Sequence, residues 1–341
     1  MKTVTLGSTG ITVLQNGFGA LPIQRISTED AVALVQKAYK GGMRFFDTAR
    51  AYSDSEVKVG IAFNGMRDKV FLASKTAAKT PEDFWSDLNT SLTNLQTDYL
   101  DIYQFHCVNE VWKPGDGTGM YECMQEAKAQ GKIRHIGITM HKIGVAEEAI
   151  SSGLYETIQY PLSYLANQRE IDLVEKSANA NMGFIAMKGL AGGLLTNSKA
   201  CMAFMTQFDN VVPIWGIQKN EELDQWLSFF DSCPTYDEEI RSFIKAEQEE
   251  LQQEFCRGCG YCLPCPHKIM INQCARMSLM IRRAPTEAWT NDYWQEQMNL
   301  TTQCEECGIC QSRCPYELPI PELLKKNYED YQNVLREMKK K

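Results

Sequence analysis

Eight of the thirteen cysteines of this 341-residue chain form two spaced motifs near its C-terminal end. The first motif reads CRGCGYCLPCP and the second reads CEECGICQSRCP. Three thiolates that recur every third residue let a tight loop wrap three corners of an iron–sulfur cube. The spacing therefore predicts two [4Fe–4S] clusters. Two four-cysteine zinc sites are the alternative.

The fourth cysteine of each motif precedes a proline and is too constrained to reach the same cube, and in two-cluster ferredoxins it ligates the other cluster. The first motif has two residues rather than three before its last cysteine, so it departs slightly from that spacing. We expect the ligands of the first cluster to be Cys256, Cys259, Cys262 and Cys314. We expect those of the second cluster to be Cys304, Cys307, Cys310 and Cys265. The other cysteines are interpreted as core thiols, namely Cys107, Cys123, Cys201, Cys233 and Cys274.

Four polar residues stand at or just after the ends of three predicted strands in the first part of the chain: Asp47, Tyr52, Lys75 and His106. Each would be costly to bury alone, but together they form an acid–base device. Asp47 would hold Lys75 charged, and the ammonium group would lower the pKa of the Tyr52 phenol. His106 would orient a substrate carbonyl while Tyr52 delivers the proton.

These residues need a scaffold that brings strand ends together. Short apolar strands are predicted at residues 17–21, 44–48, 70–74, 100–106, 133–139, 157–161, 184–188 and 211–217. Amphipathic helices are predicted at 28–40, 56–63, 82–95, 120–129, 145–151, 168–178, 199–205 and 220–230. Eight such strand–helix units favour an α/β fold of the (β/α)8 TIM barrel type, in which chemistry sits at the carboxyl ends of the strands. A doubly wound open sheet is the rival, but GFGALP after the first strand lacks its third glycine.

The composition is that of a globular protein, with 44% hydrophobic and 23% charged residues. We expect a barrel domain at 1–235 and a C-terminal α-helical dicluster ferredoxin-like domain at 236–341, opening with a polar helix at 236–254. A net charge of −8 gives no reason to expect nucleic-acid binding. No apolar run is long enough to span a membrane, and the N-terminus predicts a hairpin rather than a signal peptide. We therefore expect a cytoplasmic protein whose thiols stay reduced.

The first 230 or so residues resemble the aldo-keto reductase superfamily. The resemblance is carried by the opening LGSTGITVLQNGFGALPI and by the segments FFDTARAY, SK, DYLDIYQFH and IRHIGIT. With the cysteine motifs, the whole chain is similar to the branch of that superfamily with a ferredoxin-like 4Fe-4S extension. The resemblance implies an NAD(P)-dependent oxidoreductase that interconverts a carbonyl and an alcohol. It makes Tyr52 the general acid and completes the catalytic set with Asp47, Lys75 and His106.

The resemblance also implies a nicotinamide site near the last four strands, and the residues expected to bind the cofactor are Thr139, Gln159, Met187, Leu190, Gly216 and Gln218. This chain departs from the family pattern at three positions. Met140 stands where an amide is usual, Met187 replaces a stacking aromatic ring, and Glu222 replaces an arginine that grips a 2′-phosphate. A carboxylate repels phosphate, so NADH could be preferred over NADPH, or nicotinamide binding could be weak or lost.

The two kinds of cofactor raise a difficulty, because nicotinamide moves two electrons as hydride and a [4Fe–4S] cluster moves one. The clusters could be structural, or they could connect the barrel to a separate flavoprotein or ferredoxin as redox partner. The alternatives to a reductase are an electron-transfer subunit or a redox sensor whose barrel no longer uses nicotinamide. In each case no nucleic-acid or membrane partner is expected, and a reductase takes a small-molecule carbonyl or alcohol as substrate.

Overall fold

The computed structural model describes residues 1–251, 255–283 and 286–338 of the chain. It divides into two compact units. The barrel unit comprises Met1–Gly189 and Ser198–Arg241, and the helical unit comprises Leu190–Asn197 and Ser242–Lys341. The short segment Leu190–Asn197 thus lies within the barrel part of the sequence but packs with the C-terminal part of the chain.

Eight parallel strands form a closed barrel, in the order β10-β3-β4-β5-β6-β7-β8-β9. Their bounds are Gly17–Gly19 (β3), Phe45–Asp47 (β4), Phe71–Thr76 (β5), Leu100–Phe105 (β6), Ile133–Thr139 (β7), Thr157–Pro161 (β8), Gly183–Met187 (β9) and Val211–Gly216 (β10). Every predicted strand is present, with ends shifted by at most two residues, so the (β/α)8 prediction is confirmed. The expected N-terminal hairpin also forms, from β1 (Thr3–Thr5) and β2 (Thr12–Leu14).

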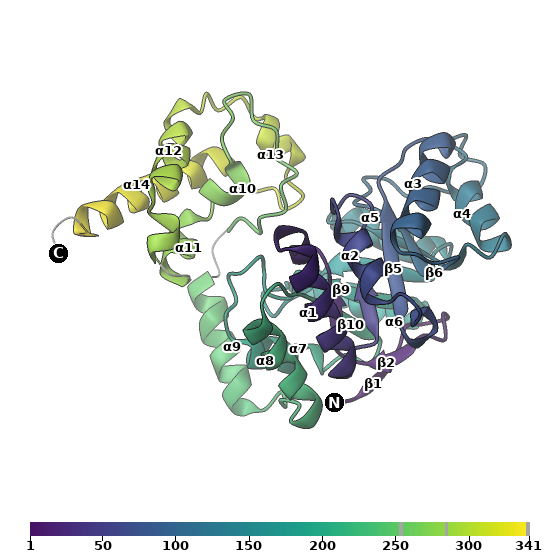
Figure 1. The fold of residues 1–341 in the computed structure, drawn as a ribbon. Coiled ribbons are helices and arrows are strands. Elements are labelled where there is room, and N and C mark those ends of the chain that lie inside the picture. The colour runs from purple at the N-terminus through teal and green to yellow at the C-terminus, as the bar shows by residue number, and fades with distance from the viewer. Residues whose placement is uncertain (252–254, 284–285, 339–341) are drawn as a thin grey trace. The chain divides into compact units, whose positions relative to one another are not determined.

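The helices of the barrel unit surround the strands (Figure 1). They are α1 (Thr28–Lys40), α2 (Ser55–Ala62), α3 (Pro81–Asn94), α4 (Met120–Ala129), α5 (Ile143–Ser152), α6 (Gln168–Asn179), α7 (Ser198–Met205) and α8 (Asn220–Asp231). Three of them begin with a side-chain cap, since Ser27, Thr80 and Asn167 accept hydrogen bonds from the first turns of α1, α3 and α6. The polar helix that follows, α9, spans Glu238–Leu251, and the rest of its predicted range, 252–254, lies outside the described residues.

The barrel is closed at its N-terminal end by the hairpin. Val4, Leu6, Ile11 and Val13 pack in one buried cluster with apolar side chains of the strands, among them Phe45 and Ile102. Gln15 follows the hairpin and donates hydrogen bonds to the carbonyl groups of Met205, Phe208 and Val211. Because this end is plugged by apolar side chains, the polar residues of the interior collect at the carboxyl end of the strands.

In the described part of the helical unit, five α-helices follow α9, and Figure 1 draws them in light green to yellow. They are α10 (Ile271–Cys274), α11 (Met277–Arg283), α12 (Asp292–Leu300), α13 (Ile309–Arg313) and α14 (Ile320–Met338). The long helix α14 organises them through two polar side chains. Asn327 accepts a hydrogen bond from the backbone N–H of Ser278 and donates one to Ala275 O, while Tyr331 is fully buried and donates to Trp289 O.

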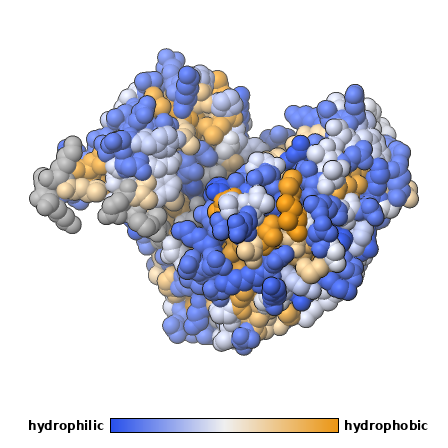
Figure 2. All heavy atoms as spheres, viewed as in Figure 1, coloured by the Kyte–Doolittle hydropathy of each residue, from blue (hydrophilic) through white to orange (hydrophobic). Residues whose placement is uncertain are grey.

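The surface of the described residues is largely hydrophilic, as Figure 2 shows for one face. Few large apolar side chains are exposed among them, including Val57 and Ile61 on α2 and Tyr293 and Ile309 in the helical unit. Within the described part of the chain, no helix combines the length and the apolar character that a membrane span requires.

Candidate active site and cysteine clusters

A buried ion pair forms the centre of the polar layer in the barrel. Asp47 is the last residue of β4 and Lys75 lies in the neighbouring β5, and both side chains are at most 2% exposed. Lys75 Nζ lies 2.5 Å from Asp47 Oδ1 and also donates to Thr48 O at 2.7 Å. Burial raises the pKa of Asp47, whereas Lys75, Gln159 and Gln104 act in the opposite direction. Such a pair is rigid, and removing one partner would leave an uncompensated buried charge.

Two glutamines extend this layer to strands β6 and β8. Gln104 donates from its amide nitrogen to Asp47 Oδ2 at 3.3 Å and to Gln159 Oε1 at 3.0 Å, and Gln159 in turn approaches Asp47 Oδ1 at 3.5 Å. A side chain at Gly137 on β7 would have its Cβ 2.7 Å from Gln104 Cγ, so the glycine leaves the room that Gln104 occupies. Gln104 was not among the predicted site residues, although it lies two residues after the interior residue Ile102 in β6 and therefore faces the same side.

Tyr52 and His106 lie beside the ion pair. Tyr52 follows β4 in the loop before α2, and His106 directly follows β6. The two rings meet edge to face with centroids 5.6 Å apart, and Lys75 Nζ lies 5.2 Å from the centroid of the Tyr52 ring. The structure therefore brings all four predicted catalytic side chains together, although their assignment to catalysis stays a prediction.

The expected direction of the Tyr52 pKa was wrong. Burial, followed by the charges of Asp47 and Cys107, raises the pKa of Tyr52 well above its ordinary value. The error came from considering Lys75 alone, since Asp47 sits close to that ammonium and offsets its charge. Tyr52 is therefore a neutral phenol at physiological pH, ready to donate a proton.

Histidine 106 is also neutral. Burial, together with the charge of Lys75, lowers the pKa of His106 to about 3. A neutral imidazole has one N–H donor and one acceptor. His106 can thus donate a hydrogen bond to a carbonyl oxygen without competing with Tyr52 as proton donor.

The residues predicted to bind a nicotinamide lie at the ends of the later strands. Thr139 ends β7, Gln159 lies in β8, Met187 ends β9, and Gly216 ends β10. Thr139 Oγ1 already accepts a hydrogen bond from the backbone N–H of Cys107 at 2.7 Å. Gln218 follows β10, whereas Leu190 belongs to the segment that packs in the helical unit.

The N-terminus of α8 is occupied by a carboxylate of the chain itself. Glu222 Oε2 accepts hydrogen bonds from the backbone N–H groups of Gln218 at 2.9 Å and Lys219 at 3.1 Å. Unpaired N–H groups at a helix N-terminus are favourable sites for phosphate. Here the carboxylate accepts from the two residues that directly precede the helix and adds a negative charge at that place.

Cysteine 107, interpreted as a core thiol from the sequence, lies instead at the carboxyl end of the barrel. It is half-buried, has a positive φ of 55°, and its Sγ lies 3.9 Å from His141 Nδ1. Burial and the charges of Lys188 and His106 keep the pKa of His141 well below its ordinary value. Only the adjacency of Cys107 to His106 could have suggested this position.

The cysteines predicted to ligate the first cluster are close enough to influence one another. Burial, followed by the charges of Cys256, Cys259 and Cys314, raises the pKa of Cys262 to about 12. Burial also raises the pKa of Cys256, and Cys259 and Cys314 add to that shift. Cys314, from the second motif, is therefore a neighbour of the first motif, as the crossed ligation requires.

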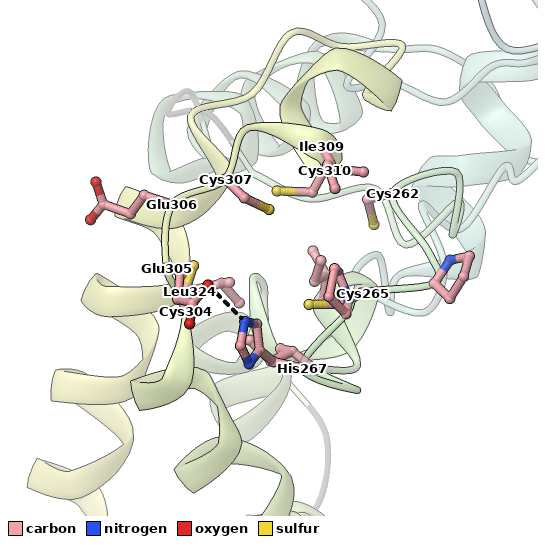
Figure 3. A pocket seen from close by; sticks show the side chains of 14 residues that line it. Cys262, Cys265, His267, Cys304, Glu305, Glu306, Cys307, Ile309, Cys310 and Leu324 are labelled. Atoms are coloured by element: carbon pink, nitrogen blue, oxygen red, sulfur yellow. Dashed lines mark ion pairs between the residues drawn. The ribbon is translucent and has the colours of Figure 1, made fainter.

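The cysteines predicted for the second cluster line one pocket, which encloses about 390 Å³ of empty space including open solvent. Its lining includes Cys265, Cys304, Cys307 and Cys310. In Figure 3 the sulfur atoms of Cys307 and Cys310 point toward each other, and that of Cys265 points into the same space. Cys262 borders the pocket as well, so the two predicted sets are adjacent.

Besides the cysteines, the lining of this pocket is apolar except for His267, Glu305 and Glu306. His267 lies at the pocket with Nε2 at 3.4 Å from Glu305 Oε2 (Figure 3). Cys274 lies outside both sets and is fully buried, as predicted for a core thiol. Among the described residues, no group of three or more His, Cys, Asp or Glu side chains is arranged to hold a single metal ion. The pocket and its four thiols fit a cluster, whose size separates its ligands more widely than one ion does.

The family of the chain follows from its sequence match. The model of the Aldo/keto reductase family matches residues 13–227, well over half of the chain. The chain belongs to the aldo/keto reductase family. Its C-terminal part matches a 4Fe-4S dicluster domain at residues 255–319, which spans both cysteine motifs. The protein is thus an oxidoreductase of this family with an iron–sulfur extension, as the sequence predicted.

Characterised relatives include dehydrogenases and reductases. The chain is 26% identical over 287 residues to L-galactose dehydrogenase of Arabidopsis thaliana, covering 73% of this chain and 90% of that protein. It is 35% identical over 161 residues to methylglyoxal reductase DkgB of Salmonella typhimurium, covering 43% of this chain and 58% of the relative.

Solved structures confirm the barrel fold. The holo form of an aldo-keto reductase from Bacillus halodurans matches with a TM-score of 0.63 at 21% identity, covering 72% of this chain and 96% of that one. An aldo-keto reductase from Klebsiella pneumoniae in complex with NADPH matches with a TM-score of 0.61 at 23% identity, covering 72% of this chain and 94% of that one.

Proposed function

We propose that this oxidoreductase interconverts a small carbonyl compound and the corresponding alcohol, with a nicotinamide as hydride carrier and Tyr52 as proton donor. The observation that carries the proposal is the meeting of Tyr52, His106 and the buried Asp47–Lys75 pair at the carboxyl end of the barrel. Side chains at this end of a (β/α)8 barrel are the ones that perform chemistry.

The proposed roles follow from the protonation states. When bound, the reduced nicotinamide supplies a hydride to the carbonyl carbon. His106, as a neutral imidazole, holds the carbonyl oxygen by a hydrogen bond and so orients it toward Tyr52. Tyr52 gives its phenolic proton to that oxygen, and Lys75 stabilises the phenolate that remains. Asp47 keeps Lys75 in place throughout.

Thr139 and Gln159 are the polar groups that would hold the nicotinamide, with Met187 as an apolar contact. Gln159 already lies in the polar layer, and its amide is oriented by Gln104. Gly216 is exposed at the end of β10 and offers a backbone without a side chain. A solved relative of the same fold is described in complex with NADPH, which supports nicotinamide use in this chain.

Transfer of isotope tests the proposal directly. Anaerobically purified protein would be incubated with NADH deuterated at C4 and a panel of small aldehydes and ketones. We expect deuterium at the carbinol carbon of one or more products, measured by mass spectrometry. If neither NADH nor NADPH binds at millimolar concentration, and no product carries deuterium, the proposal is wrong.

The carboxylate at the start of α8 makes NADH the expected cofactor. Replacing Glu222 by Gln removes the charge that lies on the N–H groups of Gln218 and Lys219. We expect E222Q to shift the ratio of the two nucleotide dissociation constants toward NADPH about tenfold, or about 1.4 kcal/mol. Fluorescence titration with each nucleotide would measure it. E221Q, at the exposed neighbouring position, is the matched control and should leave the ratio unchanged.

For the helical unit we propose two [4Fe–4S] clusters, ligated as the motifs predict. When bound, they supply one-electron transfer, which a nicotinamide does not perform directly. A flavoprotein or a ferredoxin is the partner class that we propose to exchange these electrons. The thiols fit this role because each predicted set is gathered in one place, one of them around a pocket.

A second candidate function is an electron-transfer subunit whose barrel does not use nicotinamide. Its support is Met140, fully buried where the family usually has an amide, together with Glu222 on the α8 N-terminus. This candidate predicts normal cluster reduction with no nucleotide binding, so the titration above separates the two functions.

A further inference from the structure

Arg276 is a buried cation in the helical unit for which neither the cluster ligands nor the barrel chemistry accounts. It lies between α10 and α11, and the residue is only 6% exposed. Its guanidinium group donates to Gln273 Oε1 at 2.8 Å and to Gly192 O at 3.1 Å. Gly192 belongs to Leu190–Asn197, the segment that follows β9 and packs in the helical unit.

Two glycines make room for this guanidinium group. A Cβ on Gly192 would lie 2.6 Å from Arg276 Nη1, and one on Gly258 would lie 2.7 Å from the same atom. Both glycines also have a positive φ, 70° and 69°, which other residues rarely adopt. Arg276 thus packs between two segments. Gly192 belongs to the segment after β9, and Gly258 belongs to the loop of the first cysteine motif, between Cys256 and Cys259 in the sequence.

The guanidinium group of Arg276 lies against the loop that carries these cysteines, at Gly258. The backbone N–H of Gly258 in turn donates to Cys256 Sγ at 3.4 Å, so Arg276 is close to a predicted ligand of the first cluster. A buried cation beside a cluster favours its reduced, more negative form, because charge and hydrogen bonding set the potential of iron–sulfur clusters.

The second set of cysteines has a different electrostatic environment. Cys307 is exposed, and its neighbours in the sequence are Glu305 and Glu306, both exposed. Figure 3 shows the Glu306 side chain pointing away from the pocket. These nearby carboxylates disfavour added negative charge at the second cluster, whereas the cation of Arg276 favours it at the first. The two clusters should therefore differ in potential, with the exposed one as the point of contact with a redox partner.

We propose that Arg276 raises the reduction potential of the first cluster above that of the second, and that it couples the charge of the first cluster to the segment Leu190–Asn197. This inference rests on the cluster ligation proposed above. A reduced ferredoxin or flavoprotein would deliver electrons singly to the exposed second cluster. Each electron would then pass to the first cluster, which has the higher potential. The added negative charge attracts the Arg276 guanidinium more strongly. Because Arg276 donates a hydrogen bond to Gly192 O, the segment Leu190–Asn197 then becomes more ordered.

Redox titration of the full chain, followed by electron paramagnetic resonance, tests the first part. We expect two reduction steps in the parent protein, with dithionite as the source of electrons. In R276Q the equilibrium constant of the higher step should fall about tenfold, or about 59 mV for one electron, while the lower step stays in place. R276K keeps the charge, so its potential should lie closer to that of the parent than R276Q does.

Hydrogen–deuterium exchange of residues 190–197 tests the coupling. Exchange should be slower in the reduced than in the oxidised parent, and this difference should vanish in R276Q. R282Q changes an exposed arginine that pairs with Asp330, and should leave both readouts unchanged. Equal or absent shifts of the two steps in R276Q would overturn the inference, as would an exchange rate independent of redox state in the parent. Iron and sulfide contents would be measured on the same samples. If the proposed ligation is wrong, clusters are missing from the parent protein, whereas failure of the Arg276 inference leaves both clusters present.

Discussion

Y52F should lose carbonyl reduction by a factor of about 10²–10⁴, the range expected when a positioned general acid is removed. The substitution deletes only the phenolic oxygen, so the ring should keep its edge-to-face contact with His106 and its place beside Lys75. Neither neighbour can replace the lost proton donor. His106 is neutral, and Lys75 is held by Asp47 and by Thr48 O.

The measurement is steady-state turnover of the carbonyl substrate found in the isotope experiment. Y121F is the matched control, because Tyr121 lies on α4 and its hydroxyl donates to Leu154 O. It should cost about 1 kcal/mol of stability and leave turnover unchanged. The absorbance of the clusters should be the same in both variants. If Y52F kept turnover close to that of the parent, Tyr52 would not be the proton donor.

The sequence allowed the barrel and its catalytic set to be predicted for a physical reason. In a (β/α)8 barrel the position of a residue around the ring follows its order in the chain, so residues at consecutive strand ends must be neighbours. Asp47, Lys75 and His106 stand at such ends, and the structure brings them together. Strand bounds followed from apolar runs and turn signals, and all eight agree within two residues.

Contacts set by side-chain geometry could not be predicted in the same way. The pKa of Tyr52 depends on the balance of Lys75 against Asp47, and on Cys107, whose position needs an unusual positive φ. The hydrogen bonds of Glu222 to its own helix start require one particular rotamer. The hydrogen bond from Arg276 to Gly192 O joins residues 84 positions apart in the sequence, and no local sequence pattern predicts that contact.

The crossed ligation of the clusters could be predicted only in part, because it depends both on motif spacing and on how the two motifs pack. Motif spacing predicted it, although the first motif is one residue shorter than the ferredoxin pattern. In the structure Cys265 shares a pocket with the second motif, and the charge of Cys314 acts on Cys256 and Cys262. Cys262 lines the same pocket, so the crossing stays a prediction, and removing cysteines in pairs tests it.

The pairs C259A/C314A and C259A/C265A should differ by one whole cluster. If Cys259 and Cys314 ligate the same cluster, their joint removal costs no more than either single change, and about half of the iron and sulfide remains. Cys259 and Cys265 would ligate different clusters, so C259A/C265A should lose almost all iron. Uncrossed ligation predicts the reverse: C259A/C265A would keep the second cluster, and C259A/C314A would lose almost all iron. C274A, which removes a fully buried thiol outside both sets, should keep both clusters and so separates loss of a ligand from loss of packing. The readout is the difference in iron content between two double variants that share C259A. A general weakening of the helical unit would lower the iron content of both variants and would not produce the difference that crossed ligation predicts.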